Sequence, residues 1–343
     1  MAHASGSQAP SNSSAGRLAI ALGDPAGIGA EVTLKALALP EGQALDPAPL
    51  LVGCRQWLET SYTTLRQCCN EPLRDPACLE IVDRPLPDPV KAGESTAACG
   101  DASFAWLTAA VELVQSGRCQ SLVTAPIAKA SWQAAGHTYP GQTERLAELC
   151  GGVSASMLFT ARAPVDGWRL NTLLATTHLP LEAVPDALDP ALINAKLDAL
   201  LHFCQRFNRR PKLVVAGLNP HAGEAGLLGR QEQEWLQPCL QSWQASHPEA
   251  LLEGPLPPDS CWLSAAAAWR GEGPGADGYL ALYHDQGLIP VKLLAFDAAV
   301  NTTLGLPFLR TSPDHGTAFA IAGKGIARAT SMAAAIETAV SLG

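Results

Sequence analysis

Short apolar runs alternate with helix-like segments along most of this chain. Runs of four to eight mostly apolar residues occur at 18–22, 121–124, 170–177, 213–217 and 279–283. Short continuous runs of this kind are typical of strands that are covered on both faces, as in a parallel sheet. Their alternation with helical segments predicts a layered α/β fold with largely parallel sheets.

The clearest predicted helix follows the run at 170–177. Asp189 is a suitable N-cap, and Pro190 occupies the first helical position, where its missing N–H costs nothing. Apolar side chains then recur on one face of this helix, at Ile193, Leu197, Leu200, Leu201 and Cys204. A second helix is expected at 31–39, and the proline-rich stretch 83–93 is expected to be a loop within a domain.

Composition narrows the class of protein. The chain has 343 residues and a formal net charge of -9, so its surface repels a nucleic-acid backbone, and a bound phosphate needs a few local cations. The ten cysteines lack metal-site spacing and are expected to be reduced and mostly buried. Residues 1–16 are predicted to be a disordered leader without a signal peptide. No apolar stretch is expected to reach the roughly 18 residues that span a bilayer, so we expect a cytoplasmic protein.

Three histidines occur in a common setting, each just after a predicted strand. His178 follows the run at 170–177, and His221 and His284 follow the next two runs along the chain. Because the carboxyl ends of parallel strands meet at one edge of a sheet, three imidazoles can converge on one divalent ion and leave positions open for substrate. The alternative for each is a hydrogen-bonded loop residue, the commoner role of a single histidine.

Two glycine-containing segments are candidate anion sites. Gly141–Glu144 opens a helix, so Thr143 and the nearby backbone amides can donate to an anion. The turn Gly23–Gly29 also opens a helix, but it lacks the dinucleotide-binding fingerprint. It is therefore either a weak anion site or simply a tight turn.

Lys292, Asn301 and Arg310 lie in a stretch otherwise dominated by apolar residues. Long cations in such surroundings either keep their charge in water or are paired with an anion. A bound phosphate is one such partner, and a structural salt bridge to Asp297 or Asp314 is the alternative.

Eight ordered stretches resemble the 4-hydroxythreonine-4-phosphate dehydrogenase family. They are GDPAGIGAE from Gly23, VTAPIAKA from Val123, GQTE from Gly141, ATTHLPL from Ala175, GLNPHAGE from Gly217, GPLPPDS from Gly254, YHDQGLIPVK from Tyr283 and VNTTLGLPFLRTSPDHGTA from Val300. The resemblance implies a two-domain fold of the isocitrate/isopropylmalate dehydrogenase type, with 17–140 plus 305–343 in one domain and 141–304 in the other. It also implies a homodimer with its site at the subunit interface.

The resemblance further implies NAD- or NADP-linked, metal-dependent oxidation of 4-phosphooxy-L-threonine in vitamin B6 synthesis. The product, 2-amino-3-oxo-4-phosphooxybutanoate, would lose CO₂ to give 3-amino-2-oxopropyl phosphate. The divalent ion (zinc, magnesium or cobalt) is expected at His178, His221 and His284, and the substrate at Gln142, Thr143, Lys292, Asn301 and Arg310. Asp259, Asp285 and metal-bound water are candidates for the general base. The NAD adenosine is expected at His315, Gly316, Thr317 and Ala318.

Departures from the family pattern leave other functions open. Gln142 replaces a common family histidine and cannot take a proton at neutral pH, so it is assigned to binding. Ala30 and Gln231 replace a proline and a glutamate and are expected to be tolerated. A paralogue acting on D-threonate or D-erythronate 4-phosphate shares these motifs. A metal-dependent hydrolase and a non-catalytic phosphometabolite-binding protein are further alternatives.

Overall fold

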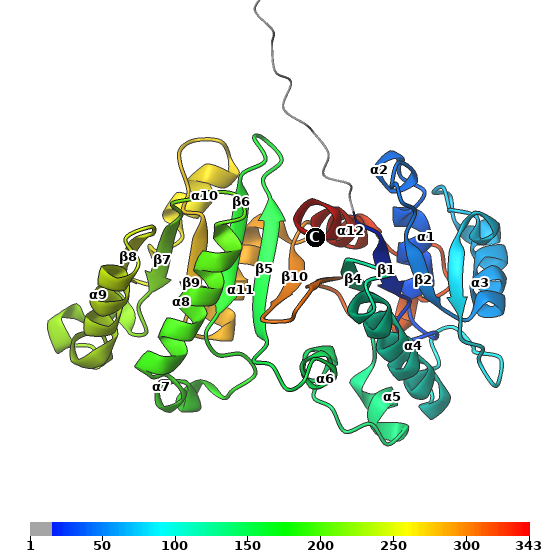
Figure 1. The fold of residues 1–343 in the computed structure, drawn as a ribbon, viewed down its shortest axis with the longest axis horizontal. Coiled ribbons are helices and arrows are strands. Elements are labelled where there is room, and N and C mark those ends of the chain that lie inside the picture. The colour runs from blue at the N-terminus through cyan, green and yellow to red at the C-terminus, as the bar shows by residue number, and fades with distance from the viewer. Residues whose placement is uncertain (1–15) are drawn as a thin grey trace, which may run out of the picture.

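The computed structural model describes residues 16–343 as one eleven-stranded sheet with helices on its faces (Figure 1). The strand order is β3-β2-β1-β4-β11-β10-β5-β6-β9-β7-β8. The strands are β1 Leu18–Ala21, β2 Leu50–Gly53, β3 Glu80–Asp83, β4 Ser121–Thr124, β5 Ser156–Arg162, β6 Arg169–Leu174, β7 Lys212–Ala216, β8 Leu251–Leu256, β9 Gly278–Ala281, β10 Val300–Leu304 and β11 Leu309–Pro313. The predicted leader lies outside the described residues except for Gly16.

The helices alternate with these strands. They are α1 Gly29–Ala36, α2 Pro40–Gln43, α3 Arg55–Cys68, α4 Ala97–Gln115, α5 Lys129–Ala134, α6 Gln142–Leu149, α7 Val184–Ala187, α8 Pro190–Cys204, α9 Gln237–Ser246, α10 Leu263–Trp269, α11 His284–Ala295 and α12 Thr330–Leu342. Short 3₁₀ turns are η1 Pro76–Cys78, η2 Leu181–Ala183, η3 Pro220–Gly226 and η5 Phe319–Ile321, and η4 Glu232–Leu236 is a π-helical turn. The predicted α/β fold with a largely parallel sheet is therefore confirmed.

The centre of the sheet differs from the two ends. Strand β5 pairs antiparallel with both β10 and β6, and β10 also pairs antiparallel with β11. The remaining pairs are parallel. The tight turn between β10 and β11 contains Gly305 at φ +89°, where an added Cβ would lie 2.2 Å from the Ser154 carbonyl oxygen. Only glycine fits this close approach, so the hairpin depends on this residue.

The sequence signals at Asp189 and Pro190 correctly predicted the start of helix α8. The Asp189 carboxylate accepts a hydrogen bond from the Leu192 amide at 2.7 Å, and α8 ends at Cys204. The helix expected at 31–39 instead runs from Gly29 to Ala36. It begins against the end of β1, where a Cβ on Gly29 would meet the Leu22 carbonyl oxygen at 2.2 Å.

The apolar core forms three clusters of buried side chains. One contains residues from 18–146 together with 300 and 322–339, and the other two draw mainly on 157–309. All ten cysteines are free thiols, and six of them are buried. Interior packing, with no cross-links among these thiols, therefore holds the fold together.

Helix α4 corrects one sequence-based expectation. It has 19 residues with a mean hydropathy of 1.2, long and apolar enough to cross a membrane by length and composition alone. In the fold, 56% of this stretch is buried, and α4 packs against α5 and the strands β1, β2 and β4. Its apolar character is that of a core helix, since such a helix contacts protein around much of its circumference.

Candidate active site

A cavity of about 370 Å³ lies where α6 meets the ends of β4, β6 and β11. Its walls include seven of the predicted site residues: Gln142, Thr143, His178, Asn301, Arg310, His315 and Gly316. Predicted site residues up to 174 positions apart in sequence are thus brought together at one cavity. The cavity has the size of a small-metabolite site.

Arg310 forms the buried cationic wall of this cavity. Its guanidinium donates to the Thr124 hydroxyl at 2.7 Å through Nη2 and at 3.1 Å through Nε. It also donates to the Thr303 hydroxyl at 3.1 Å and to Gln142 Oε1 at 3.1 Å. Burial lowers the pKa of Arg310 to about 10, partly offset by the charge of Glu144, so the group remains cationic at neutral pH.

The first turn of α6 forms an adjoining wall. Gly141 precedes the helix in an extended conformation and provides no side-chain cap, so the first-turn amides beside Thr143 have no capping partner. Gln142 is held at both ends, because Nε2 donates to the Ala125 carbonyl oxygen at 3.1 Å while Oε1 accepts from Arg310. Asn301 Oδ1 is buried and has no hydrogen-bond partner. The cavity wall therefore holds polar groups that a ligand can satisfy.

Lys292 reaches the edge of this site through an ion pair. Its Nζ lies 2.8 Å from Asp314 Oδ2, and Asp314 lines the cavity. Asp314, one of the two partners that the sequence offered as an alternative to phosphate, therefore lies within ion-pair distance of Lys292, whereas Asp297 pairs with Arg328 at 2.8 Å. Lys292 itself does not line the cavity.

Two of the three predicted metal ligands lie side by side. The ring centroids of His178 and His284 are 5.5 Å apart, and His284 Nδ1 is 2.7 Å from Asp285 Oδ1. Burial lowers the pKa of His178, and the charges of Lys129 and His284 lower it further. His178 is therefore held in the neutral form that binds metals.

His221 does not join this pair within the single chain. It follows β7, two strands from β6 in the sheet, and its ring contacts Glu224 at 3.1 Å. Among residues 16–343, no group of three or more His, Cys, Asp or Glu side chains is arranged to hold a metal ion.

The loop that carries His221 has an unusual backbone. His221 to Ala225 all have positive φ values between 41° and 81°, and for residues other than glycine this conformation costs about 1–2 kcal/mol each. The buried Glu232 carboxylate holds the base of the loop, accepting from the amides of Leu218 and Asn219 at 2.8 and 2.7 Å. Strain of this kind concentrates at functional sites.

The predicted cofactor loop contacts the glycine-rich turn. The Ile28 amide donates to the Thr317 carbonyl oxygen at 3.0 Å, and a Cβ on Gly27 would lie 3.0 Å from that same oxygen. His315 Nε2 is buried without a hydrogen-bond partner, and Ala318 adopts a left-handed conformation. The turn at 23–29 therefore acts as a support against which this loop packs.

Comparison with known proteins decides the family. A family model described as "Pyridoxal phosphate biosynthetic protein PdxA" matches residues 46–339. The chain belongs to the PdxA family. A 4-hydroxythreonine-4-phosphate dehydrogenase of Synechococcus sp. (strain RCC307) is 66% identical over 330 residues, which cover 95% of this chain and 99% of that protein. This PdxA-family member is thus an oxidoreductase of pyridoxal phosphate synthesis.

Solved structures and other relatives agree with the PdxA assignment. The crystal structure of 4-hydroxythreonine-4-phosphate dehydrogenase from Klebsiella pneumoniae has a TM-score of 0.79 at 34% identity, covering 95% of this chain and 99% of that one. A D-threonate 4-phosphate dehydrogenase of Pectobacterium atrosepticum is 37% identical over 95% of this chain and 98% of its own length. The fold extends to isocitrate dehydrogenase from Methylococcus capsulatus, with a TM-score of 0.50 at 13% identity over 94% and 84% of the chains.

Two charged residues that line the active-site cavity were not singled out from the sequence. Lys129 and Glu144 line it beside His178, and both lie within motifs that carry the family resemblance. Their position within those motifs is the sequence signal that could have identified them as cavity residues. Asp259 lies exposed in the turn after β8 and is not among the residues that line the cavity.

Proposed function

We propose that this PdxA-family protein oxidises 4-phosphooxy-L-threonine at its secondary alcohol, with NAD or NADP as the hydride acceptor. The observation that carries the proposal is the buried Arg310 guanidinium, which faces the cavity with only neutral hydrogen-bond partners. A phosphoryl group would supply the missing negative charge. In a chain with a net charge of -9, such a local cation is what a phosphorylated substrate requires.

The phosphate site would combine three kinds of donor. Arg310 supplies charge, the first-turn amides of α6 beside Thr143 supply backbone N–H groups, and the amide of Asn301 supplies a further hydrogen-bonding group at the wall. Lys292 would act at the edge, through its ion pair with Asp314. Together these groups would fix the reacting carbon relative to the cofactor.

The histidine pair fits one part of a divalent-metal site. His178 and His284 present two imidazoles 5.5 Å apart between ring centroids, and Asp285 is placed to fix the orientation of His284. His221 would complete the set, either after a movement of its strained loop or from a second copy of the chain. A bound zinc, magnesium or cobalt ion would lower the pKa of the substrate hydroxyl.

The candidates for the general base are Asp285, Asp259 and a metal-bound water. Asp285 already contacts His284, which favours a positioning role over proton removal. Asp259 would have to approach from an exposed turn. Loss of the hydroxyl proton and transfer of hydride would leave a β-keto acid, which loses CO₂ because its ketone accepts the electrons.

A second copy of this chain is proposed to pack on helix α11. Ile289, Leu293 and Phe296 lie three and four residues apart on one face and are 59%, 80% and 60% exposed. This apolar face starts one turn after His284. An isologous homodimer on it would bring the two copies together beside the histidine pair.

The remaining assignments follow the same proposal. The NAD adenosine would lie at 315–318, since His315 and Gly316 border the cavity. Residues 17–140 with 305–343 and residues 141–304 would form the two domains, in line with the division of the apolar core. We expect the enzyme to work in the cytoplasm, with no nucleic acid or membrane as partner.

An NAD-reduction assay with 4-phosphooxythreonine, with and without chelator, tests the proposal. We expect NADH absorbance that the chelator abolishes, and weaker turnover of D-threonate and D-erythronate 4-phosphates. Faster turnover of those sugar acids would assign the chain to the paralogous activity, which its 37% identical relative makes the second candidate. Phosphate release without NADH would indicate a hydrolase, and substrate binding without turnover would indicate a non-catalytic protein.

The variant His221→Ala tests whether His221 binds the metal without contributing to the stability of the fold. We expect loss of both metal binding and activity while the circular dichroism spectrum stays unchanged, because the exposed side chain contributes little to the core. Full turnover by this variant in metal-free buffer would overturn the three-histidine site.

A further inference from the structure

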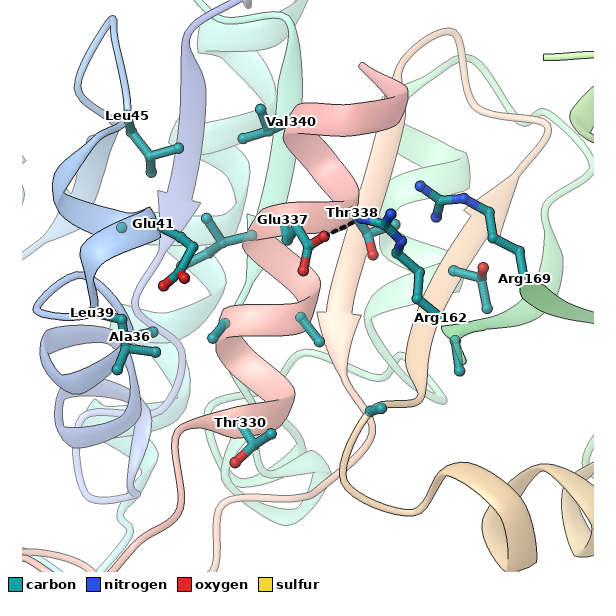
Figure 2. Close-up of a pocket in the computed structure, with 17 residues that line it drawn as sticks. Ala36, Leu39, Glu41, Leu45, Arg162, Arg169, Thr330, Glu337, Thr338 and Val340 are labelled. Atoms are coloured by element: carbon teal, nitrogen blue, oxygen red, sulfur yellow. Dashed lines mark hydrogen bonds and ion pairs between the residues drawn. The ribbon is translucent and has the colours of Figure 1, made fainter. Parts of the chain in front are cut away.

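A second cavity, of about 430 Å³, lies beside helix α12, away from the active site (Figure 2). Within the described chain it shares no lining residue with the active-site cavity. It adjoins the Arg162 end of β5, whereas the active site adjoins the Ser156 end. The seven residues of β5 span roughly 20 Å, so the two cavities occupy opposite ends of the same strand.

The floor and one wall of this cavity are apolar. Leu39 and Leu45, which flank α2, line one side, and Ala334 and Val340 of α12 also line the cavity. Leu39 is 40% exposed. An apolar recess of this size is typical of small-molecule sites.

The opposite wall carries two guanidinium groups (Figure 2). Arg162 is paired with Glu337 at 2.5 Å. Arg169 is half-buried and donates to the Ser341 hydroxyl at 3.2 Å, and its guanidinium lies 5.0 Å from the centre of the Phe207 ring. Within residues 16–343, no carboxylate lies within 4 Å of Arg169.

The charge balance of this wall favours an anion. Glu337 neutralises one of the two arginines, and Glu41 lies on α2 at the far wall, exposed to solvent. Burial lowers the pKa of Arg169 and repulsion from Arg162 lowers it further, while the charge of Glu337 offsets part of this. A carboxylate at this wall would relieve both costs, and an apolar body attached to it would cover the recess.

We propose that this cavity binds a small amphiphilic carboxylate. Its charged end would meet Arg169, and its apolar body would lie between the segment around α2 and helix α12. The bound molecule would contact residues of α2, α12, β5 and β6 at once, and so would join both halves of the sheet.

Binding of decanoate to the full-length protein tests this proposal. Calorimetric titration should give saturable binding of decanoate and about tenfold weaker binding of decan-1-ol, a difference of about 1.4 kcal/mol, because the alcohol lacks the charge-assisted hydrogen bond. Decyltrimethylammonium should bind no better than the alcohol. Absence of saturable decanoate binding, or equal binding of all three, would overturn the proposal.

Variants locate the charged end and the apolar recess. Arg169→Gln should weaken decanoate binding about tenfold, and Arg169→Lys, which keeps the charge, should weaken it less. Ala334→Leu should weaken binding of both decanoate and decan-1-ol by filling the recess. The exposed residues Arg209 and Ala245 provide matched controls, Arg209→Gln and Ala245→Leu, which should change nothing. If Arg169 only stacks on Phe207, the Arg169→Gln and Arg169→Lys variants will bind decanoate equally well, and the proposal will be overturned.

Hydrogen exchange of the wild-type protein separates this cavity from the active site. Decanoate should slow exchange in peptides that cover 36–45 and 330–340. Protection confined to 140–144 and 313–316 would place the probe in the active-site cavity and overturn the proposal.

Discussion

Lys35 and Arg310 are two buried cations that differ in whether a carboxylate lies beside them. Their residues are 2% and 3% exposed. Lys35 on α1 lies 3.1 Å from Glu31 and 2.8 Å from Glu71. Burial by itself lowers the pKa of Lys35, but the hydrogen bonds with Glu71 and Glu31 outweigh it, and the net pKa is raised above 10.5.

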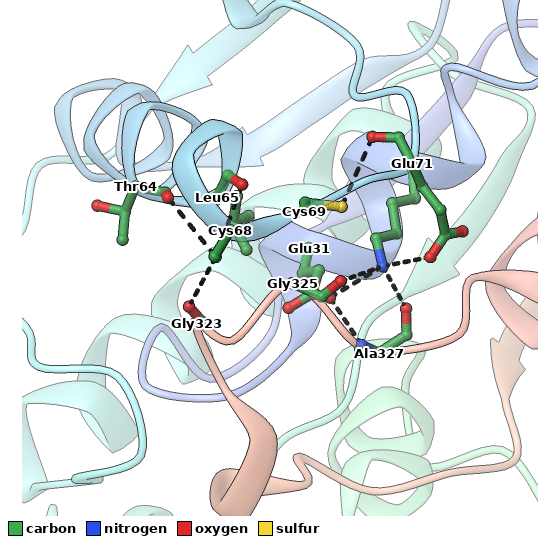
Figure 3. Close-up of polar contacts among 10 residues, drawn as sticks. Glu31, Thr64, Leu65, Cys68, Cys69, Glu71, Gly323, Gly325 and Ala327 are labelled. Atoms are coloured by element: carbon green, nitrogen blue, oxygen red, sulfur yellow. Dashed lines mark hydrogen bonds and ion pairs between the residues drawn. The ribbon is translucent and has the colours of Figure 1, made fainter.

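The Lys35 cluster ties α1 to the segment before α12. Lys35 Nζ donates to the carbonyl oxygens of Gly325 and Ala327 at 3.0 and 2.7 Å. The Ala327 amide donates in turn to Glu31 Oε1 at 2.7 Å (Figure 3). Every charge in this cluster has an opposite partner, so it serves the fold.

Arg310 is surrounded by neutral groups instead. Its four hydrogen bonds go to two threonine hydroxyls and the amide of Gln142. No carboxylate of the described chain lies within 4 Å of it, and its pKa is lowered. A buried charge without a counter-charge is costly, and the cost is acceptable where a ligand supplies the counter-charge. The comparison teaches that a buried cation with a carboxylate partner stabilises the fold, whereas a buried cation that lines a cavity without such a partner indicates a binding site for an anion.

Arg310→Met should give the largest effect. We expect the KM for 4-phosphooxythreonine to rise about a hundredfold or more, because charge-assisted hydrogen bonds of about 1.5–3 kcal/mol each are lost. The free energy of unfolding should change by less than about 1 kcal/mol, since a charge without a counter-charge is removed. Steady-state kinetics and urea unfolding measure the two. Arg209→Met is the exposed control, and an unchanged KM would assign Arg310 to structure.

Lys35→Met should show the reverse pattern. Removing this cation leaves buried Glu31 without its ion-pair partner, so we expect a loss of about 3 kcal/mol in the free energy of unfolding and little change in KM for the phosphorylated substrate. Because the pKa of Lys35 is raised above 10.5, its contribution is present below that pH and is lost as the pH rises through the folded-state pKa. Glu71→Gln, which removes only the exposed partner, should cost about 1 kcal/mol or less. Equal losses in the two variants would contradict the cluster's role.

The sequence predicted local features better than contacts across the sheet. The cap at Asp189 and the start of α6 depend on neighbouring residues and were found where expected. The antiparallel centre was missed, because pairing of β10 with β5 joins segments whose local patterns look like any other strand. The resemblance assigned Arg310 to substrate binding. It could not give the contact with Thr124, 186 residues away, which makes the charge buried and unneutralised.

The metal site shows the same limit. The sequence placed His178 and His284 just after two strands and so correctly predicted that they lie together, because β6 and β9 are adjacent in the sheet. The same reasoning placed His221 with them, and that assignment stays a prediction. The left-handed backbone of its loop turns the side chain toward Glu224, a conformation that nothing in the local sequence except Gly223 indicates.

Gln142→Glu would make the environment of Arg310 resemble that of Lys35. Gln142 Oε1 already accepts from Arg310 at 3.1 Å, so a carboxylate there would neutralise the guanidinium before any ligand arrives. We expect about a tenfold rise in the KM for 4-phosphooxythreonine, the smallest of the three effects, because the cation remains present. Inorganic phosphate should raise the Tm of the wild type but not of this variant.

Gln142→His is the matched control, because a neutral imidazole at this position leaves the charge of Arg310 in place. It should keep both the KM and the phosphate-dependent rise in Tm within about threefold and a few degrees of wild type. If Gln142→Glu bound phosphate as well as Gln142→His, the missing counter-charge would not be what draws the anion. The amides at the start of α6 would then have to carry the binding, and the contrast between Lys35 and Arg310 would concern packing alone.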